Sequence, residues 1–390
     1  MTAARLVVLL AGILILGVTA RSVLVVLVVP RPAVSFGIYP VLAVRACFRR
    51  VASLTRTYAA KDRILAVCEP VALVALLMTW LLMAMIGFTL INWGIGDGSL
   101  FDAFSEAGSS VFTLGFTSSH AEGSRVVDFL AAGTGLVLVA LQIAYLPTLY
   151  SSYNRRETLV TLLESRAGAP AWGPELLIRH QLVGTIDNLA GLFAEWERWA
   201  ADVAESHTTH PSLLNLRSPR PRNSWIVSLL SVMDAAALTV AIDPAGAPVE
   251  ARMCIRMGFT CLRDIAQATR IPYDPDPDPD GPVELPESSF QDAYRQLVAV
   301  DFPTSRPVEE AWIHFRGWRV NYESVAYAIA WRLDAPPAPW SGPRRHFRGE
   351  SMGPDRPTDR QPRLSSPGPG TIPTRTPPPP AAPAPGTPRP

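Results

Sequence analysis

The stretch GSSVFTLGFTSS, residues 108–119, lies between two long apolar segments of the chain. It is rich in serine and threonine and too polar to continue either segment. It is also too closely confined between two possible membrane spans for an ordinary loop. The role of this stretch therefore has to be inferred together with the two apolar segments that flank it.

Three runs of sequence are long enough to cross a bilayer, which takes about 20 apolar residues. They cover residues 6–29, 64–93 and 126–150. Each run contains or borders one charged residue: Arg21, Glu69 or Asp128. We interpret all three as anchors near the ends of the spans, because long or terminal charged side chains can reach the interface. An ion path through the spans is the less favoured interpretation.

The orientation follows from basic residues in the short flanking segments, which stay on the cytoplasmic side. Residues 30–63 contain seven Lys and Arg residues, and residues 155–166 contain Arg155, Arg156 and Arg166. Residues 94–125 contain only Arg125 against four acidic residues. The sequence therefore predicts a multi-pass protein of the cell membrane, with its N-terminus outside and its C-terminal part cytoplasmic.

One alternative concerns the first span. Residues 1–20 loosely fit a cleaved signal peptide, with Arg5 before an apolar run that ends in VTA. That interpretation would place the basic linker 31–63 outside and contradict the charge distribution. We expect this linker to be an amphipathic cytoplasmic segment that can lie along the inner membrane surface.

Between the second and third spans, residues 99–112 predict a short helix. Ser99 is a suitable N-cap, and Asp102 follows three residues later as in a capping box. The segment TLGFTS, residues 113–118, comes next. The order is therefore span, short helix, Thr-x-Gly-aromatic segment and span.

This order resembles the pore domain of potassium channels and related cation channels, over residues 64–155 of this chain. The resemblance implies an ion-selectivity filter formed by Thr113, Leu114, Gly115, Phe116 and Thr117. In that family, backbone carbonyls of the filter replace the water shell of a permeant monovalent cation. One pore loop per chain implies a homotetramer, since four loops close one filter.

Two residues depart from the usual family pattern Thr-Val-Gly-Tyr-Gly-Asp. Thr117 stands where the second glycine would be, and Ser118 replaces the aspartate. If the position of Thr117 needs a left-handed backbone, a β-branched residue there costs about 1 kcal/mol or more. We therefore still expect cation passage, but strict selectivity for potassium does not follow from the resemblance. The opposing interpretation of residues 99–125 is a plain extracellular loop.

The C-terminal half is rich in helical patterns over residues 173–334. Residues 224–242 are apolar enough to resemble a fourth span, but Asp234 at their centre favours a buried helix of a soluble domain. A glycine-rich nucleotide fingerprint is missing from the sequence. From residue 335 the chain is rich in Pro, Gly, Ser and Arg, which predicts a disordered tail.

Two acidic or histidine-containing segments resemble metal sites. The first contains Glu205, His207 and His210 near a predicted helix end. The second matches the spacing of a calcium loop, with Asp276, Asp278, Asp280 and Glu287 as weak candidate ligands. Prolines within that loop remove backbone donors that a calcium loop uses. We therefore predict no metal site and no resident cofactor.

Other classes of function are disfavoured. The net charge is +1, which gives no reason to expect a nucleic-acid partner. The sequence offers no nucleophile and base in a recognisable arrangement, so we predict no enzyme. The four cysteines fit neither a zinc site nor a disulfide framework.

The predicted protein is thus an all-α membrane protein with three transmembrane helices, a re-entrant pore helix between the second and third, an all-helical cytoplasmic domain and a disordered tail. The predicted boundaries are 1–30 for the first span, 31–63 for the linker, 64–155 for the pore domain, 156–334 for the helical domain and 335–390 for the tail. Its predicted function is passive cation conduction of the potassium type through a tetrameric filter in the lipid bilayer. The alternative is a non-conducting membrane-anchored sensor or scaffold that acts through its helical domain.

Overall fold

The computed structural model describes residues 3–27, 36–117, 122–345 and 351–355, and all regular elements in these ranges are helices. The N-terminal helices are α1 (Ala3–Leu27), α2 (Ile38–Ala52), α3 (Tyr58–Ile95), α4 (Leu100–Val111) and α5 (Glu122–Ala167). The later helices, which form the C-terminal bundle, are α6 (Gly173–Leu182), α7 (Leu189–Thr209), α8 (Trp225–Ile242), α9 (Val249–Thr269), α10 (Glu287–Val298), α11 (Val308–Arg319) and α12 (Glu323–Leu333). Short 3-10 turns cover Ile186–Asn188 and Pro211–Asn215.

Four of the described helices are long and apolar enough to cross a membrane: α1, α3, α5 and α8. Residues throughout α1, α3 and α5 leave large apolar side chains exposed, as lipid-facing helices do. Every residue of α8 is buried inside the bundle instead. Long apolar helices therefore indicate a membrane-embedded protein, while α8 is the central helix of the bundle.

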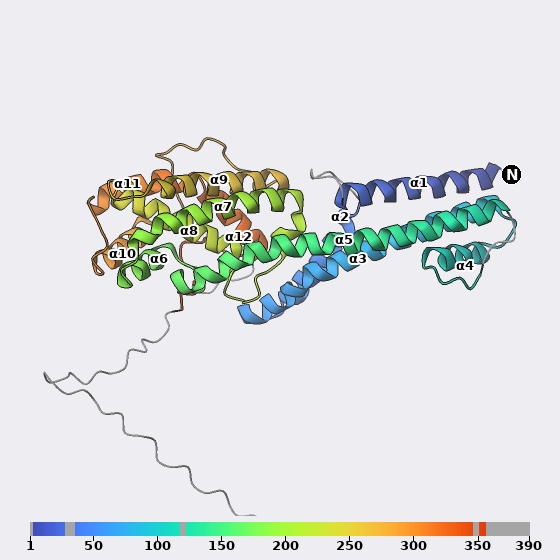
Figure 1. The fold of residues 1–390 in the computed structure, drawn as a ribbon, viewed down its shortest axis with the longest axis horizontal. Coiled ribbons are helices and arrows are strands. Elements are labelled where there is room, and N and C mark those ends of the chain that lie inside the picture. The colour runs from blue at the N-terminus through green and yellow to red at the C-terminus, as the bar shows by residue number, and fades with distance from the viewer. Residues whose placement is uncertain (1–2, 28–35, 118–121, 346–350, 356–390) are drawn as a thin grey trace, which may run out of the picture. The chain divides into compact units, whose positions relative to one another are not determined.

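Close approach of α1 and α3 depends on glycines (Figure 1). A Cβ added at Gly12 would stand 2.7 Å from the carbonyl oxygen of Gly87. A Cβ added at Gly87 would stand 2.7 Å from the side chain of Leu16. Small residues let helices pack backbone to backbone where apolar surface alone gives little preference, as in lipid.

The basic linker is helical in part, and a buried ion pair fixes it. Arg45 of α2 reaches Glu69 of α3 with two hydrogen bonds, of 3.0 and 2.6 Å. The side chain of Glu69 is only 1% exposed. An arginine held in this two-pronged way is the strong form of the interaction. Glu69 thus has a partner on α2, which the sequence did not indicate.

A buried polar network holds the bundle around α8. Asp234 accepts hydrogen bonds from Arg319 and from the Tyr322 hydroxyl. Arg319 also donates to Glu323 and to the backbone carbonyl of Trp340. Burying a charge is costly unless it is paired and hydrogen-bonded, and these contacts satisfy that need. The prediction that residues 224–242 form a buried helix rather than a fourth span agrees with this packing.

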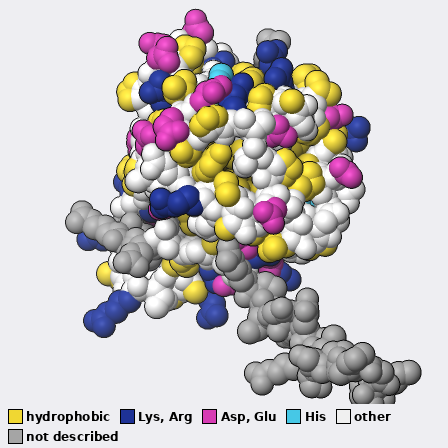
Figure 2. Space-filling model, turned by 90° about the vertical axis from the view of Figure 1, so that its left-hand side faces the viewer, with side chains coloured by type: hydrophobic (Ala, Val, Ile, Leu, Met, Phe, Trp, Pro, Cys, Tyr) yellow, Lys and Arg dark blue, Asp and Glu magenta, His cyan; other side chains and the backbone are white. Residues whose placement is uncertain are grey.

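The outer surface of the bundle differs from its interior. Figure 2 shows the bundle face with acidic, basic and hydrophobic side chains interspersed. The helical pattern that begins at Gly173 is interrupted at Gly184, which has a φ of +70° and lies between α6 and α7. Left-handed backbone at a glycine ends α6 at little cost and lets α7 start in a new direction.

The Pro-rich C-terminal segment enters the core at its start. Trp340 packs against Phe315 and Trp172, with ring centroids 5.6 and 5.8 Å apart respectively. Arg344 is buried and donates to the backbone carbonyls of Ala335 and Pro336. Residues 335–345 therefore differ from the predicted disordered tail, because one tryptophan and one arginine anchor them. Residues 356–390 of that predicted tail lie outside the described residues.

Candidate functional site: the segment after helix α4

Helix α4 begins with the predicted capping box. The Ser99 hydroxyl accepts a hydrogen bond from the backbone N–H of Asp102 at 3.1 Å. The Asp102 carboxylate accepts one from the backbone N–H of Ser99 at 3.0 Å. Two donors that have no partner within the helix are satisfied in this way. The sequence prediction of a short capped helix at this place is confirmed.

The other end of α4 is pressed against α5. Val111 is the last residue of α4, and its carbonyl group faces Gly135 of α5. A Cβ added at Gly135 would stand 1.9 Å from that carbonyl oxygen, which is closer than any real contact. Ala103 and Ala107 are buried on the same helix, so small side chains bring α4 close to its neighbours α3 and α5 (Figure 1).

The segment that follows donates its backbone N–H groups back to the end of α4. The N–H of Thr113 donates to the carbonyl of Ser110 at 2.9 Å. The N–H groups of Leu114 and Gly115 donate to the carbonyl of Ser109, at 2.8 and 3.4 Å. The Ser109 hydroxyl accepts from the N–H of Thr117 at 3.2 Å and donates to the Thr117 carbonyl at 3.0 Å.

These hydrogen bonds fix where the carbonyl groups point. In a planar trans peptide, the carbonyl of one residue points opposite to the N–H of the next. The N–H groups of Thr113, Leu114 and Gly115 point toward α4, so the carbonyls of Phe112, Thr113 and Leu114 point away from it. The same holds for the Phe116 carbonyl, because Thr117 donates to Ser109. The carbonyls of Phe112, Thr113, Leu114 and Phe116 thus form a row that points away from the supporting helix, whereas the Thr117 carbonyl is turned back to Ser109.

Residues with a left-handed backbone conformation alternate with residues of negative φ along this segment. Thr113 and Gly115 have φ values of +55° and +69°. Left-handed backbone is rare for a β-branched residue and easy for glycine. Thr117 is not among the described residues with positive φ. The expected strain therefore falls on Thr113 instead of Thr117, whose N–H and carbonyl are both bonded to Ser109. Ser118 lies outside the described residues.

The five predicted filter residues thus form one continuous segment, with Leu114 64% and Phe116 66% exposed in the single chain. Sequence analysis did not find Ser109 as their support. Its signal was weak, because a serine in the last turn of a helix has many ordinary uses. On α5, Gly135 is the residue that permits the close approach of α4, and Val111 is its neighbour on α4.

The histidine candidates are occupied by other contacts. His207 is buried, with Nε2 3.0 Å from the Arg156 guanidinium and Nδ1 3.0 Å from the Ser206 hydroxyl. Burial, with the nearby Arg156 charge, holds the pKa of His207 well below its usual range. His210 packs edge-on against Tyr145 at 5.4 Å between ring centroids. A neutral histidine in the bundle core fits these contacts.

The acidic calcium-like loop is a surface turn. The carboxylates of Asp274 and Asp278 accept hydrogen bonds from the backbone N–H groups of Asp276 and Asp280, respectively. Asp280 also pairs with Arg316 at 3.2 Å. Asp276, Asp278, Asp280 and Glu287 are exposed, and within the described ranges no three His, Cys, Asp or Glu side chains are grouped to hold a metal ion.

Both long helices that flank α4 are bonded to the bundle. Near the start of α3, Lys61 pairs with Asp334 at 2.7 Å and Asp62 with Arg217 at 3.1 Å. From α5, Arg156 donates to the carbonyls of Leu213 and Leu216, both at 2.6 Å. Sequence patterns do not indicate these contacts, because the two α3 ion pairs join residues 273 and 155 positions apart, and the two α5 contacts join residues 57 and 60 positions apart.

Comparisons with known proteins return no family. No protein-family model, no curated protein and no solved structure matches the chain. The function is therefore inferred from the geometry of the segment after α4 and from its connections to the bundle.

Proposed function

We propose that the chain is one subunit of a homotetrameric membrane channel that conducts monovalent cations passively, with Thr113–Thr117 as its filter. The observation that carries this proposal is the row of carbonyls turned away from α4. Carbonyl oxygens in such a row can replace the water shell of a cation. The C-terminal end of α4, which carries the negative end of the helix dipole, lies at the same place.

In this proposal α1, α3 and α5 cross the bilayer and α4 re-enters it from outside. The N-terminus lies outside, and the C-terminal bundle is cytoplasmic. Four copies are needed because each chain provides one filter segment. The exposed side chains of Leu114 and Phe116 then face neighbouring subunits or the pore helices that surround the filter.

The connections to the bundle support a regulated pore. The ion pairs of Lys61 and Asp62 bind the bundle to α3, and Arg156 binds it to α5. A change in bundle packing would therefore move both helices that hold α4. We propose that the bundle sets the open probability of the pore through these contacts.

The test is potassium efflux from liposomes that contain the purified protein. Gly115→Val is expected to abolish the flux, because a β-branched residue at a φ of +69° costs about 1–2 kcal/mol or more and distorts the filter. Gly17→Val in α1 is the control, since nothing lies within 4 Å of a Cβ there. It should leave the flux unchanged.

Absence of flux from folded tetramers, at several voltages and pH values, would contradict the channel. The chain would then be better explained as a membrane-anchored sensor or scaffold. Replacing potassium by sodium in the same liposomes measures selectivity, which the resemblance to potassium channels leaves open because of Thr117.

A further inference from the structure

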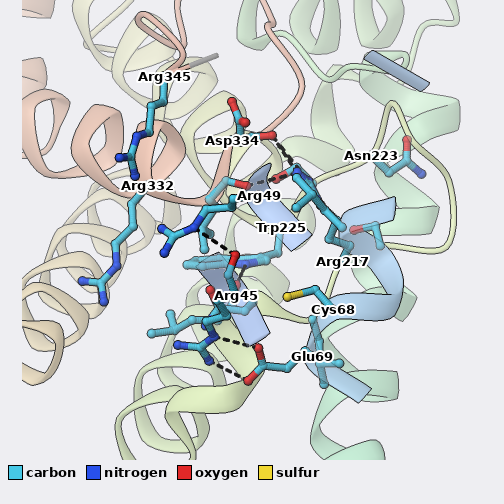
Figure 3. A pocket seen from close by; sticks show the side chains of 18 residues that line it. Arg45, Arg49, Cys68, Glu69, Arg217, Asn223, Trp225, Arg332, Asp334 and Arg345 are labelled. Carbon is cyan, nitrogen blue, oxygen red and sulfur yellow. Dashed lines mark hydrogen bonds and ion pairs between the residues drawn. The ribbon is translucent and has the colours of Figure 1, made fainter. Parts of the chain in front are cut away.

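A cavity of about 80 Å³ lies where α2 and α3 meet the C-terminal bundle. Five arginines from separate elements line it: Arg45 and Arg49 from α2, Arg217 before α8, Arg332 from α12, and Arg345 beyond it. Figure 3 shows Arg45, Arg49 and Arg217 near Trp225 and Cys68, with Arg332 and Arg345 at the margin of the same space. Arginines from elements distant in the sequence therefore line the same cavity. The Arg332 guanidinium also donates to the Thr269 carbonyl at 3.0 Å, and that of Arg345 lies over the Trp331 ring, 5.1 Å from its centroid.

Carboxylates compensate only part of this charge. Glu69 and Asp334 are the acidic residues of the lining. Glu69 is bonded to Arg45, and Asp334 is paired with Lys61. Arg217 pairs with Asp62. Arg49, Arg332 and Arg345 have no ion pair with a carboxylate among the described residues.

The arginines also act on one another. Burial and then the nearby charges of Arg45 and Arg49 lower the pKa of Arg332. Like charges gathered around a cavity raise the free energy of the folded state unless a counter-charge is present. The arrangement thus calls for an anion that the chain itself does not provide in its described part.

Neutral donors complete the lining. The Ser218 side chain is buried, with the residue 6% exposed, and its hydroxyl has no hydrogen-bond partner within the described ranges. Asn223, Ser224 and Trp225 bring the start of α8 to the cavity. The Ser224 side chain does not cap α8. The first N–H groups of this 18-residue helix therefore lack a side-chain cap, and its positive dipole end favours an anion.

We propose that this cavity is a binding site for a phosphate group. Guanidinium groups match the tetrahedral oxygens of phosphate with paired hydrogen bonds, and several of them share its charge. The cavity has room for several water-sized groups, since one water needs at least about 10–15 Å³ of such space. That size suits one phosphate group, supplied either by inorganic phosphate or by the headgroup of an anionic lipid.

Binding at this place would tie the linker helix α2 to the bundle. Arg45 and Arg49 belong to α2, whereas Arg217, Arg332 and Arg345 belong to the bundle and the segments beside it. A phosphate bonded to both sets removes their repulsion and closes the junction. The site stands on the cavity alone, so it does not depend on whether the filter conducts.

The test uses the full chain in phosphatidylcholine nanodiscs and measures the midpoint of thermal unfolding. One arm titrates sodium phosphate against sodium chloride at equal ionic strength. The other replaces part of the phosphatidylcholine by phosphatidylglycerol. A ligand that binds only the folded protein raises the midpoint in a saturable way. A rise in the first arm assigns the site to free phosphate, and a rise in the second assigns it to a lipid headgroup.

Variants locate the effect. Arg49→Gln with Arg332→Gln should weaken phosphate binding by roughly tenfold or more, because each loses a charged hydrogen bond. Ser218→Ala, which removes one hydroxyl, should weaken it by roughly three- to tenfold and serves if the double variant folds poorly. Arg252→Gln, on the exposed surface of α9, should behave as the unchanged protein.

The proposal is overturned if neither arm raises the midpoint of the unchanged protein. It is also overturned if the ligand raises the unfolding midpoint of the folded Arg49 and Arg332 double variant, or of Ser218→Ala, as much as that of the unchanged protein. An equal loss in Arg252→Gln would likewise overturn it, because general surface charge would then explain the binding.

Discussion

The backbone of Gly135 lies directly against the carbonyl oxygen of Val111, at a distance that leaves no room for a methyl group. This contact places the end of α4 on α5. Any filter formed by the next residues therefore takes its position from one glycine of the long helix.

Gly135→Ala is expected to displace α4 and to destabilise the protein by about 1–3 kcal/mol, the usual cost of overpacking. Flux from liposomes should fall with it. Gly133→Ala is the matched control, because nothing lies within 4 Å of a Cβ at that position. Thermal unfolding and potassium efflux check the pair. Equal behaviour of the two variants would show that the contact with Val111 does not matter.

Ser109→Ala is expected to free Thr117, since the hydroxyl both accepts from its N–H and donates to its carbonyl. Two lost hydrogen bonds correspond to about 1–3 kcal/mol in the local structure. The ratio of potassium to sodium flux should drop, while total expression and helix content stay the same. Ser105→Ala is the control, because that hydroxyl bonds only to the preceding turn in the described structure. Unaltered selectivity in Ser109→Ala would show that Ser109 does not hold the filter segment in place.

Acid should loosen the junction of α5 with the bundle. The pKa of His207 is held well below its usual range in the folded protein, so the unfolded chain binds its proton first as pH falls. The stabilisation from neutral His207 is complete above about pH 6.5 and is lost as pH falls toward its lowered folded pKa. The slope from one group is at most about 1.4 kcal/mol per pH unit.

His207→Gln should flatten this dependence between pH 7 and pH 5, measured by denaturant unfolding at each pH. His314→Gln is the comparison, since His314 is 46% exposed. It should keep the acid dependence of the unchanged protein. If both variants keep the same slope, another group causes the loss of stability in acid.

Trp340→Ala is expected to cost about 3–5 kcal/mol, although the residue lies beyond the last helix. The residue is only 8% exposed, its ring packs against Phe315 and Trp172, and its carbonyl accepts from Arg319. Trp331→Ala removes a ring that is 42% exposed and should cost about 1 kcal/mol or less. Urea unfolding of the full chain in detergent measures both. Similar losses would mean that residues 335–345 do not belong to the core.

The sequence predicts local features of this protein well. The apolar runs, the capping box at Ser99 and the buried character of residues 224–242 follow from spacing and from Asp234. Each depends on residues close together in the chain, where periodicity and capping chemistry apply. Helix α5 continues past residue 150, the predicted end of the third span, to Ala167.

The sequence does not predict features that depend on partners far apart in the chain. Arg319 lies 85 residues from Asp234, and Arg217 lies 155 residues from Asp62. Trp340 stands in a Pro-rich segment whose composition is typical of disorder, and only its contacts show that it is core. Of the site, the filter residues were predicted from a resemblance, whereas Ser109 as their support and the arginine cavity required the fold.

Helix α5 contains both Gly135 and Arg156, which are 21 positions apart with Pro147 between them. At about 1.5 Å per residue, the two points lie about 30 Å apart, and each residue between them adds about 100° of rotation. Their relative orientation around the helix axis is therefore set by the number of residues between them and by the helix geometry at Pro147. One inserted residue would rotate the face that contacts Val111 relative to the face that binds Leu213. Only one of these two contacts could then be kept. The number of residues in this part of α5 therefore sets the orientation of its contact with α4 relative to its contact with the bundle.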